Sequence, residues 1–227
     1  MEQVILASSD PSEPSRTAAD WAAHEARLRG LPLRVVHGQP QEVSEAKVVV
    51  CGLRREDVAD SQTAGTPLPA NVEAAARPLV FVPDDISGPL HSEGVTLGVD
   101  ARNPAAAAIA FAFDSARIRG SRLHVVHAWS LPASAAELPF AIPEEDRAAW
   151  EDQEVQQLAD ALQPWCEKHP EIPVLQDVVL FAPAQALLHC SAGAALVVVG
   201  RRPGAEWRHI LRSLLREATC PVAVVPS

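Results

Sequence analysis

The chain has 227 residues, a formal net charge of −10, and 48% hydrophobic against 21% charged residues. This composition is sufficient for a packed core and excludes global disorder, while the acidic excess disfavours nucleic-acid binding, which needs a basic face. No apolar run approaches the ~18 residues of a membrane span, and the opening MEQVILASSD lacks the pattern of a signal peptide. We therefore expect a cytoplasmic protein with no membrane contact.

The four cysteines are spread along the chain, at Cys51, Cys166, Cys190 and Cys220. None stands in a C-x2-C pair, and no histidine cluster has zinc-binding spacing. We expect free thiols that are buried or half-buried, and no metal site.

Strands and helices alternate in residues 1–83. The apolar run 4–8 ends in Ser-Asp-Pro-Ser, which is typical of a strand that passes into a helix start. Residues 15–29 have apolar side chains at helical spacing before Gly30, and the runs 33–36 and 47–51 lack polar alternation, as in strands buried on both faces. The expected elements are strands at 4–8, 33–36, 47–51 and 79–82, and helices at 15–29 and 71–76.

A polar segment rich in proline and glycine, 84–94, predicts a linker, and a longer alternation follows it. We expect strands at 95–99, 123–128, 174–180, 195–199 and 222–225, and helices at 104–119, 144–169, 183–191 and 208–218. Such alternation predicts parallel sheets with right-handed crossovers. The fold class is therefore α/β, with two Rossmann-like units: an abridged four-stranded domain at 1–83 and a complete five-stranded domain at 95–227.

Short sequences recur in the same order, which indicates an internal repeat. Asp10, Leu28-Arg29-Gly30 and Val35-Val36-His37 recur 90 residues later as Asp100, Ile118-Arg119-Gly120 and Val125-Val126-His127. Val49-Val50-Cys51-Gly52 matches Val197-Val198-Val199-Gly200. Between these landmarks the first copy has 15 residues and the second has 73, so the first copy lacks 58 residues that would form a strand and its flanking helices.

Several motifs together resemble the universal stress protein family, over almost the whole chain as a tandem pair. They are Asp10-Pro11-Ser12-Glu13-Pro14-Ser15, Trp21-Ala22-Ala23-His24-Glu25-Ala26, Leu33-Arg34-Val35-Val36-His37, Leu196-Val197-Val198-Val199-Gly200 and Cys220-Pro221-Val222-Ala223-Val224-Val225. The resemblance implies a sheet of strand order 3-2-1-4-5, with ATP held in some members between strands 1 and 4. An Asp ends strand 1 in those members, and a loop patterned G-x2-G-x9-G-[S/T] follows strand 4.

The resemblance places ATP, the only expected cofactor, in the first copy. Gly52, Gly65 and Thr66 keep the spacing of the loop, whereas Arg55 replaces its second glycine and either meets a phosphate or blocks the approach. A plain surface loop is the alternative, since Pro67 and Pro69 remove N–H donors. Carried over to both copies, the implied nucleotide-binding residues are Asp10, Val36, Gly52, Arg55, Gly65, Thr66, Asp100, Val126 and Gly200.

The second copy departs from the loop pattern after Gly200. Its loop is five residues short, and Arg208-His209 stand at the expected helix start in place of the Gly-Ser pair. Arg201, Arg202, Arg208 and Arg212 form either an anion site or, as we favour, a solvated face. We therefore expect the second copy to bind ATP weakly or not at all.

The predicted function is that of a non-enzymatic stress-response sensor or scaffold. The alternative is a nucleotide-independent interaction protein, and an ATP-splitting enzyme is disfavoured because no S-G-G-x-D-S or H-x-G-H motif is present. His37 and His127 are expected to be packing residues at strand ends. The two copies should pair through their last strands, 79–82 and 222–225, which covers two apolar sheet edges. The sequence leaves open a homodimer and an unidentified protein partner.

Overall fold

The computed structural model describes residues 3–9, 13–37, 45–58, 72, 75–85, 94–132 and 143–226. Five helices are α1 (Glu13–Arg29), α3 (Ala106–Arg119), α5 (Glu144–Lys168), α6 (Pro183–Cys190) and α7 (Ala205–Glu217), and η1 (Arg55–Asp57) is a 3-10 turn. The strands are β1 (Val4–Ser9), β2 (Leu33–His37), β3 (Ala46–Leu53), β4 (Leu79–Pro83), β5 (Val95–Gly98), β6 (Leu123–Trp129), β7 (Val174–Leu180), β8 (Leu196–Gly200) and β9 (Val222–Val225). The helix expected at 71–76 lies largely outside the described residues.

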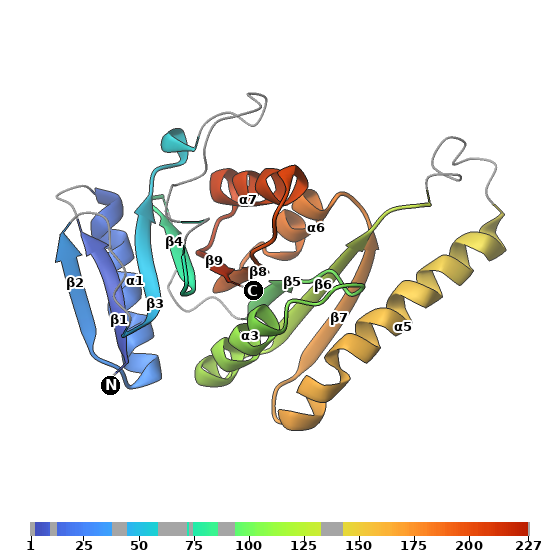
Figure 1. The fold of residues 1–227 in the computed structure, drawn as a ribbon, viewed down its shortest axis with the longest axis horizontal. Coiled ribbons are helices and arrows are strands. Elements are labelled where there is room, and N and C mark those ends of the chain that lie inside the picture. The colour runs from blue at the N-terminus through green and yellow to red at the C-terminus, as the bar shows by residue number, and fades with distance from the viewer. Residues whose placement is uncertain are drawn as a thin grey trace.

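The nine strands of the described residues form one sheet, in the order β2-β1-β3-β4-β9-β8-β5-β6-β7. Every neighbouring pair is parallel except β4 and β9, which are antiparallel with Val80 opposite Ala223. The sheet therefore has an N-terminal half (β1–β4) and a C-terminal half (β5–β9) that meet at its centre (Figure 1). The expected α/β class with a mainly parallel sheet is confirmed.

Helices cover both faces of the sheet. The core on one face contains side chains of α1, α3 and α5, and the core on the other contains side chains of α6 and α7. Figure 1 shows α3 and α5 on the opposite side of the C-terminal half from α6 and α7. Each core includes strand residues from both halves, so the halves share their apolar interior. Within the described part of the chain, no helix has the length and hydropathy that a membrane span requires.

Two expectations from the sequence are wrong. The strand at 33–36 is not buried on both faces, because Leu33 is 36% and Val35 46% exposed on the α1 side of edge strand β2. The last helix begins at Ala205 rather than at 208, after Gly204 with a positive φ of 113°. Arg208 and His209 therefore lie inside the helix and do not form its N-terminus.

A buried ionic network joins α1 of the N-terminal half to α3 of the C-terminal half. Glu25, whose side chain is 1% exposed, accepts a 2.6 Å hydrogen bond from Arg29 and a second bond from Arg119. Arg29 also contacts Asp114 at 2.5 Å. Burial raises the pKa of the Asp114 carboxyl, but hydrogen bonds and charges from Arg117 and Arg29 outweigh it and hold the pKa below its usual 3.8.

Candidate functional site

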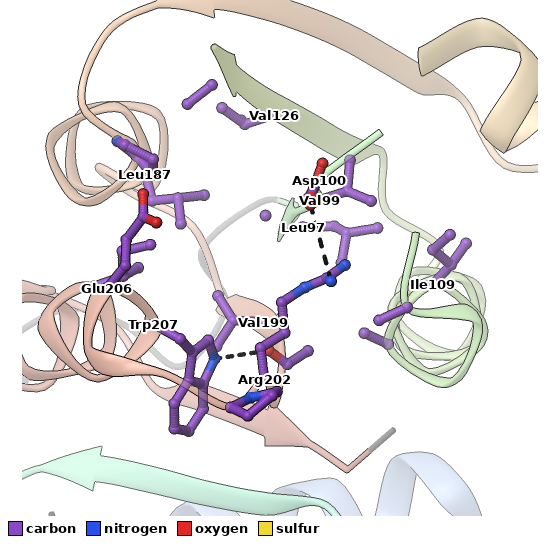
Figure 2. Close-up of a pocket in the computed structure, with 18 residues that line it drawn as sticks. Leu97, Val99, Asp100, Ile109, Val126, Leu187, Val199, Arg202, Glu206 and Trp207 are labelled. Atoms are coloured by element: carbon purple, nitrogen blue, oxygen red, sulfur yellow. Dashed lines mark hydrogen bonds and ion pairs between the residues drawn. The ribbon is translucent and has the colours of Figure 1, made fainter. Parts of the chain in front are cut away.

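A pocket of about 280 Å³ opens at the carboxyl ends of β5 and β8, between α3, α6 and α7 (Figure 2). From β5 the chain continues through α3 to β6 on one side, and it later returns from β7 through α6 to β8 on the other side of β5. Crevices of open α/β sheets lie at such switch points, where ligands bind. Its lining consists of Leu97, Gly98, Val99, Asp100, Ala105, Ala108, Ile109, Val126, Ala128, Pro183, Leu187, Val199, Gly200, Arg202, Pro203, Glu206, Trp207 and Ile210.

The floor of the pocket is apolar, and two glycines bring its walls close together. A Cβ atom at Gly98 would lie 2.8 Å from a methyl of Leu187 on α6, and one at Gly200 would lie 2.7 Å from the Cβ of Ala105. Real Cβ atoms do not approach so closely. At Gly200 the neighbour is a Cβ atom fixed to the backbone, so this position needs glycine, whereas a side chain at Gly98 would require the Leu187 methyls to shift. The glycine at 200 thus has a structural role whether or not a ligand binds.

Polar groups gather at the mouth of the pocket. A guanidinium nitrogen of Arg202 lies 3.9 Å from a carboxylate oxygen of Asp100, and Arg202 also donates to the carbonyl of Asn103. The Trp207 indole donates a 2.8 Å hydrogen bond to the carbonyl of Gly200, which fixes the loop before α7 (Figure 2). The backbone N–H groups that begin α7 follow Gly204, and helix N-termini favour anions.

Three of the residues predicted from the sequence come together in this pocket. Asp100, Val126 and Gly200 all line it, although they come from three different segments of the chain. In the N-terminal half, Val36 and Gly52 lie near the carboxyl ends of β2 and β3. The other loop and strand-end residues, Asp10, Gly65 and Thr66, lie outside the described residues, so the predicted site in that half stays a prediction.

Comparison with known proteins identifies the family. Residues 93–226, which include every lining residue of the pocket, match the universal stress protein family. This chain belongs to the universal stress protein family. The chain is 30% identical to the universal stress protein Rv2005c of Mycobacterium tuberculosis, over 98% of this chain and 95% of that one. It is also 30% identical to Rv1996 of the same organism, over 93% of this chain and 70% of that one.

Solved structures share the fold of this universal stress protein at lower identity. A universal stress protein from Archaeoglobus fulgidus superposes with a TM-score of 0.57 at 15% identity, covering 98% of both chains. A protein of unknown function from Pseudomonas aeruginosa PAO1 gives a TM-score of 0.52 at 14% identity, covering 99% of this chain and 82% of that one. These likenesses extend over both halves of the sheet.

This universal stress protein has fewer residues than its alignment with Rv2005c has positions. The comparison runs over 285 positions, whereas the chain has 227 residues. At least 58 positions, the difference between the two lengths, therefore have no residue of this chain. The deficit agrees in size with the segment that the repeat pattern indicates is missing from residues 1–83.

Arg55, predicted as a nucleotide contact, connects the two halves of this universal stress protein. Its guanidinium donates to the carboxylate of Asp85 at 2.8 and 2.9 Å, to the carbonyl of Arg216 at 2.5 Å and to that of Ala218 at 2.8 Å. Both carbonyls lie at the C-terminal end of α7, where a cation is favourable. These four contacts give Arg55 a structural role, and its contact with a nucleotide stays a prediction.

Arg201, in the C-terminal half, makes a similar connection to the N-terminal half. Its guanidinium donates to the carbonyl of Ala75 at 2.7 Å and lies 3.4 Å from that of Val72, both in the segment that precedes β4. Arg201 and Arg202 therefore have protein partners rather than forming an open cationic face with Arg208 and Arg212. Their contacts fix the loop between β8 and α7.

His127, expected as a packing residue at a strand end, is a buried polar group beside Asp100, and its partner Glu154 was not expected from the sequence. His127 is 3% exposed, and its Nε2 lies 3.0 Å from the carboxylate of Glu154 on α5, which is itself 3% exposed. Its Nδ1 lies 3.2 Å from the carbonyl of Val99 and 3.4 Å from the amide of Ala101. His127 thus holds the backbone on both sides of Asp100. A signal was available, since Glu154 precedes Leu158 and Leu162 at helical spacing on the buried stripe.

Proposed function

We propose that this universal stress protein is a non-enzymatic sensor or scaffold of the stress response whose state depends on a bound adenine nucleotide. The observation that carries the proposal is the convergence of Asp100, Val126 and Gly200 on one pocket at the β5–β8 switch point. Among the described lining residues there is no Ser, Thr, Cys, His or Lys, so no nucleophile of those types faces the pocket. This supports a binding role rather than catalysis.

The pocket suits a compact nucleotide. Its volume of about 280 Å³ is just below the ~300–1,000 Å³ that small-molecule sites occupy, which favours a nucleoside or its monophosphate over ATP. The apolar floor would hold the faces of a base, and the Asp100 carboxylate would accept hydrogen bonds from ribose hydroxyls. Arg202 and the first amides of α7 would attract a phosphate.

The tandem interpretation places a second candidate site in the N-terminal half. We infer that residues 1–83 and 95–227 are two units of the family fold, because short sequences recur and each half continues outward from a last strand at the centre of the sheet. Gly52, Gly65 and Thr66 keep the ATP-loop spacing there. An ATP site in the first unit and a smaller nucleotide site in the second are therefore separable proposals.

A nucleotide-independent interaction protein is the second candidate function. The observation that favours it is the contact between Asp100 and Arg202, which pairs these two charged groups with each other without any ligand. On this interpretation the pocket is a remnant of the fold, and a cytoplasmic protein partner binds to another surface of the chain.

Binding of AMP and ATP, measured by calorimetry on the intact chain, tests these proposals. Ala128 lines the pocket, so Ala128→Phe should weaken AMP binding at least about tenfold, equal to about 1.4 kcal/mol. Ala192→Phe, at an exposed turn after α6, is the matched control and should leave affinity unchanged. Gly65→Val should affect only binding in the N-terminal half.

The outcomes separate the candidates. Loss of AMP binding in Ala128→Phe but not in Gly65→Val supports the pocket in the C-terminal half. ATP binding that Gly65→Val alone abolishes places the nucleotide in the N-terminal half instead. If neither AMP nor ATP binds at millimolar concentration, the proposed dependence on a nucleotide is contradicted. The nucleotide-independent interaction protein is then the remaining candidate.

A further inference from the structure

Three potential metal ligands meet on the α6 side of the sheet, away from the pocket. His124 lies on β6, Asp177 on the neighbouring edge strand β7, and Cys190 at the last position of α6. In the parallel pairing of the two strands His124 is opposite Leu175, so Asp177, two residues further along β7, is on the same face of the sheet. Cys190 and Val179 pack in the core on that face.

The spacing of the three ligand atoms is close to that of a tetrahedral metal site. His124 Nε2 lies 3.3 Å and Cys190 Sγ 3.8 Å from the same oxygen, Asp177 Oδ2, and all three ligand atoms lie within 4.8 Å of one another. Zinc bonds of about 2.0–2.3 Å at tetrahedral angles place neighbouring ligand atoms about 3.4–3.6 Å apart. The two measured distances bracket that range, so small side-chain rotations would suffice.

The site is held firmly yet remains open to solvent. The backbone carbonyl of Cys190 accepts a 3.3 Å hydrogen bond from the Thr96 hydroxyl of β5, which ties the end of α6 to the sheet. His124 is 19% and Asp177 40% exposed at the side chain. Three protein ligands with solvent access leave a fourth position for water, an arrangement that zinc adopts in proteins.

The chemistry of the donors selects the class of metal. A thiolate is a poor ligand for Mg²⁺ or Ca²⁺, which prefer oxygen, whereas a mixed nitrogen, oxygen and sulfur set suits Zn²⁺. Among the described residues, this is the one cluster of three or more such side chains with a spacing that would hold a metal ion.

We propose that His124, Asp177 and Cys190 bind one Zn²⁺ ion, with water at the fourth position. Without metal, the Cys190 thiol is placed to donate to Asp177. On binding, sulfur forms its bond to zinc and the thiol proton leaves to solvent, so each bound ion releases that proton. The ion would fasten edge strand β7 to α6. This proposed zinc site does not depend on nucleotide binding in the pocket.

Metal titration of the reduced, chelator-treated full chain tests the site. Zn²⁺ should bind with a stoichiometry of one and raise the melting temperature, and Co²⁺ should give thiolate-to-metal charge-transfer absorption with tetrahedral ligand-field bands. Cys190→Ser, Asp177→Asn and His124→Gln should each weaken binding at least about tenfold. Cys166→Ser and His169→Gln change half-buried residues outside the cluster and serve as controls.

The spectrum of unmodified protein with Co²⁺ is decisive even if a variant fails to fold. Absence of the thiolate band, or Zn²⁺ binding that Cys190→Ser leaves unchanged, would overturn the proposal and reduce the cluster to a hydrogen-bonded group. A band lost only in the three cluster variants would support it.

Discussion

The two halves of the sheet differ most at their outer ends. In the C-terminal half β7 and the 25-residue helix α5 extend the structure, and Val174 and Val178 of β7 pack against the core on the α5 side. In the N-terminal half the sheet ends at β2, where Leu33 and Val35 are exposed on the same side. Both apolar cores run from one half into the other, so we expect the shorter half to depend on the longer one for its fold.

The largest expected effect comes from separating the halves. A fragment of residues 1–85 should be insoluble or lack cooperative unfolding, since it loses the β9 partner of β4 and the α3 partner of α1. A fragment of residues 92–227 should fold and self-associate through exposed β9. Thermal unfolding by circular dichroism and sedimentation analysis check both expectations.

A monomeric, sharply melting 1–85 fragment would contradict this dependence. It would show that the N-terminal half forms a sufficient core alone and that the shared interior is not needed for its fold.

A smaller effect is expected from the ionic network between α1 and α3. Glu25→Gln removes the carboxylate that faces both Arg29 and Arg119 in a buried setting, and should cost about 3 kcal/mol of unfolding free energy. The control Glu45→Gln alters an exposed pair with Arg34 at 3.8 Å and should cost less than about 1 kcal/mol. Urea unfolding measures both, and equal losses would mean that the network does not connect the halves energetically.

The smallest effect concerns acid sensitivity at the same interface. The pKa of Asp114 is lower in the folded chain than its usual 3.8, so its ion pairs stabilise the fold fully above that pH and lose this contribution as pH falls through the folded value. Between about pH 5 and pH 3, wild-type protein should therefore lose up to about 1 kcal/mol more stability than Asp114→Asn. Identical pH dependence in urea unfolding would contradict a role for this carboxylate.

Sequence patterns located most elements because burial and helix signals are local. The helix expected at 144–169 matches α5 within one residue, since three acidic residues in its first turn and a regular apolar stripe define it. That β2 is an edge strand follows from the segment missing from the first copy, but an apolar run does not reveal that one face of the strand is also left uncovered by a helix. The expected start of α7 was wrong because it followed the family loop pattern, although the later apolar side chains have helical spacing with Trp207, namely Leu211, Leu214 and Leu215.

The candidate site was predictable only where it consists of strand ends. Asp100, Val126 and Gly200 could be named because the family resemblance implies nucleotide contacts at strand ends, and the carboxyl ends of parallel strands meet at the same end of the sheet. His127 with Glu154, and His124 with Asp177 and Cys190, could not be paired from the sequence. The partners are separated by up to 66 positions, from His124 to Cys190, and meet only through the register of β6 and β7 and the packing of α5 and α6.

The single antiparallel pair at the centre of the sheet determines where two ligands would sit. Strands β1–β3 run parallel to β4, and β5–β8 run parallel to β9, while β4 and β9 oppose each other. The carboxyl ends of the strands in one half therefore lie at the opposite end of the sheet, along the strand direction, from those in the other half. Molecules bound at these two ends would be separated by the length of the strands. Any effect of one ligand on the binding of the other must therefore pass through the shared interior.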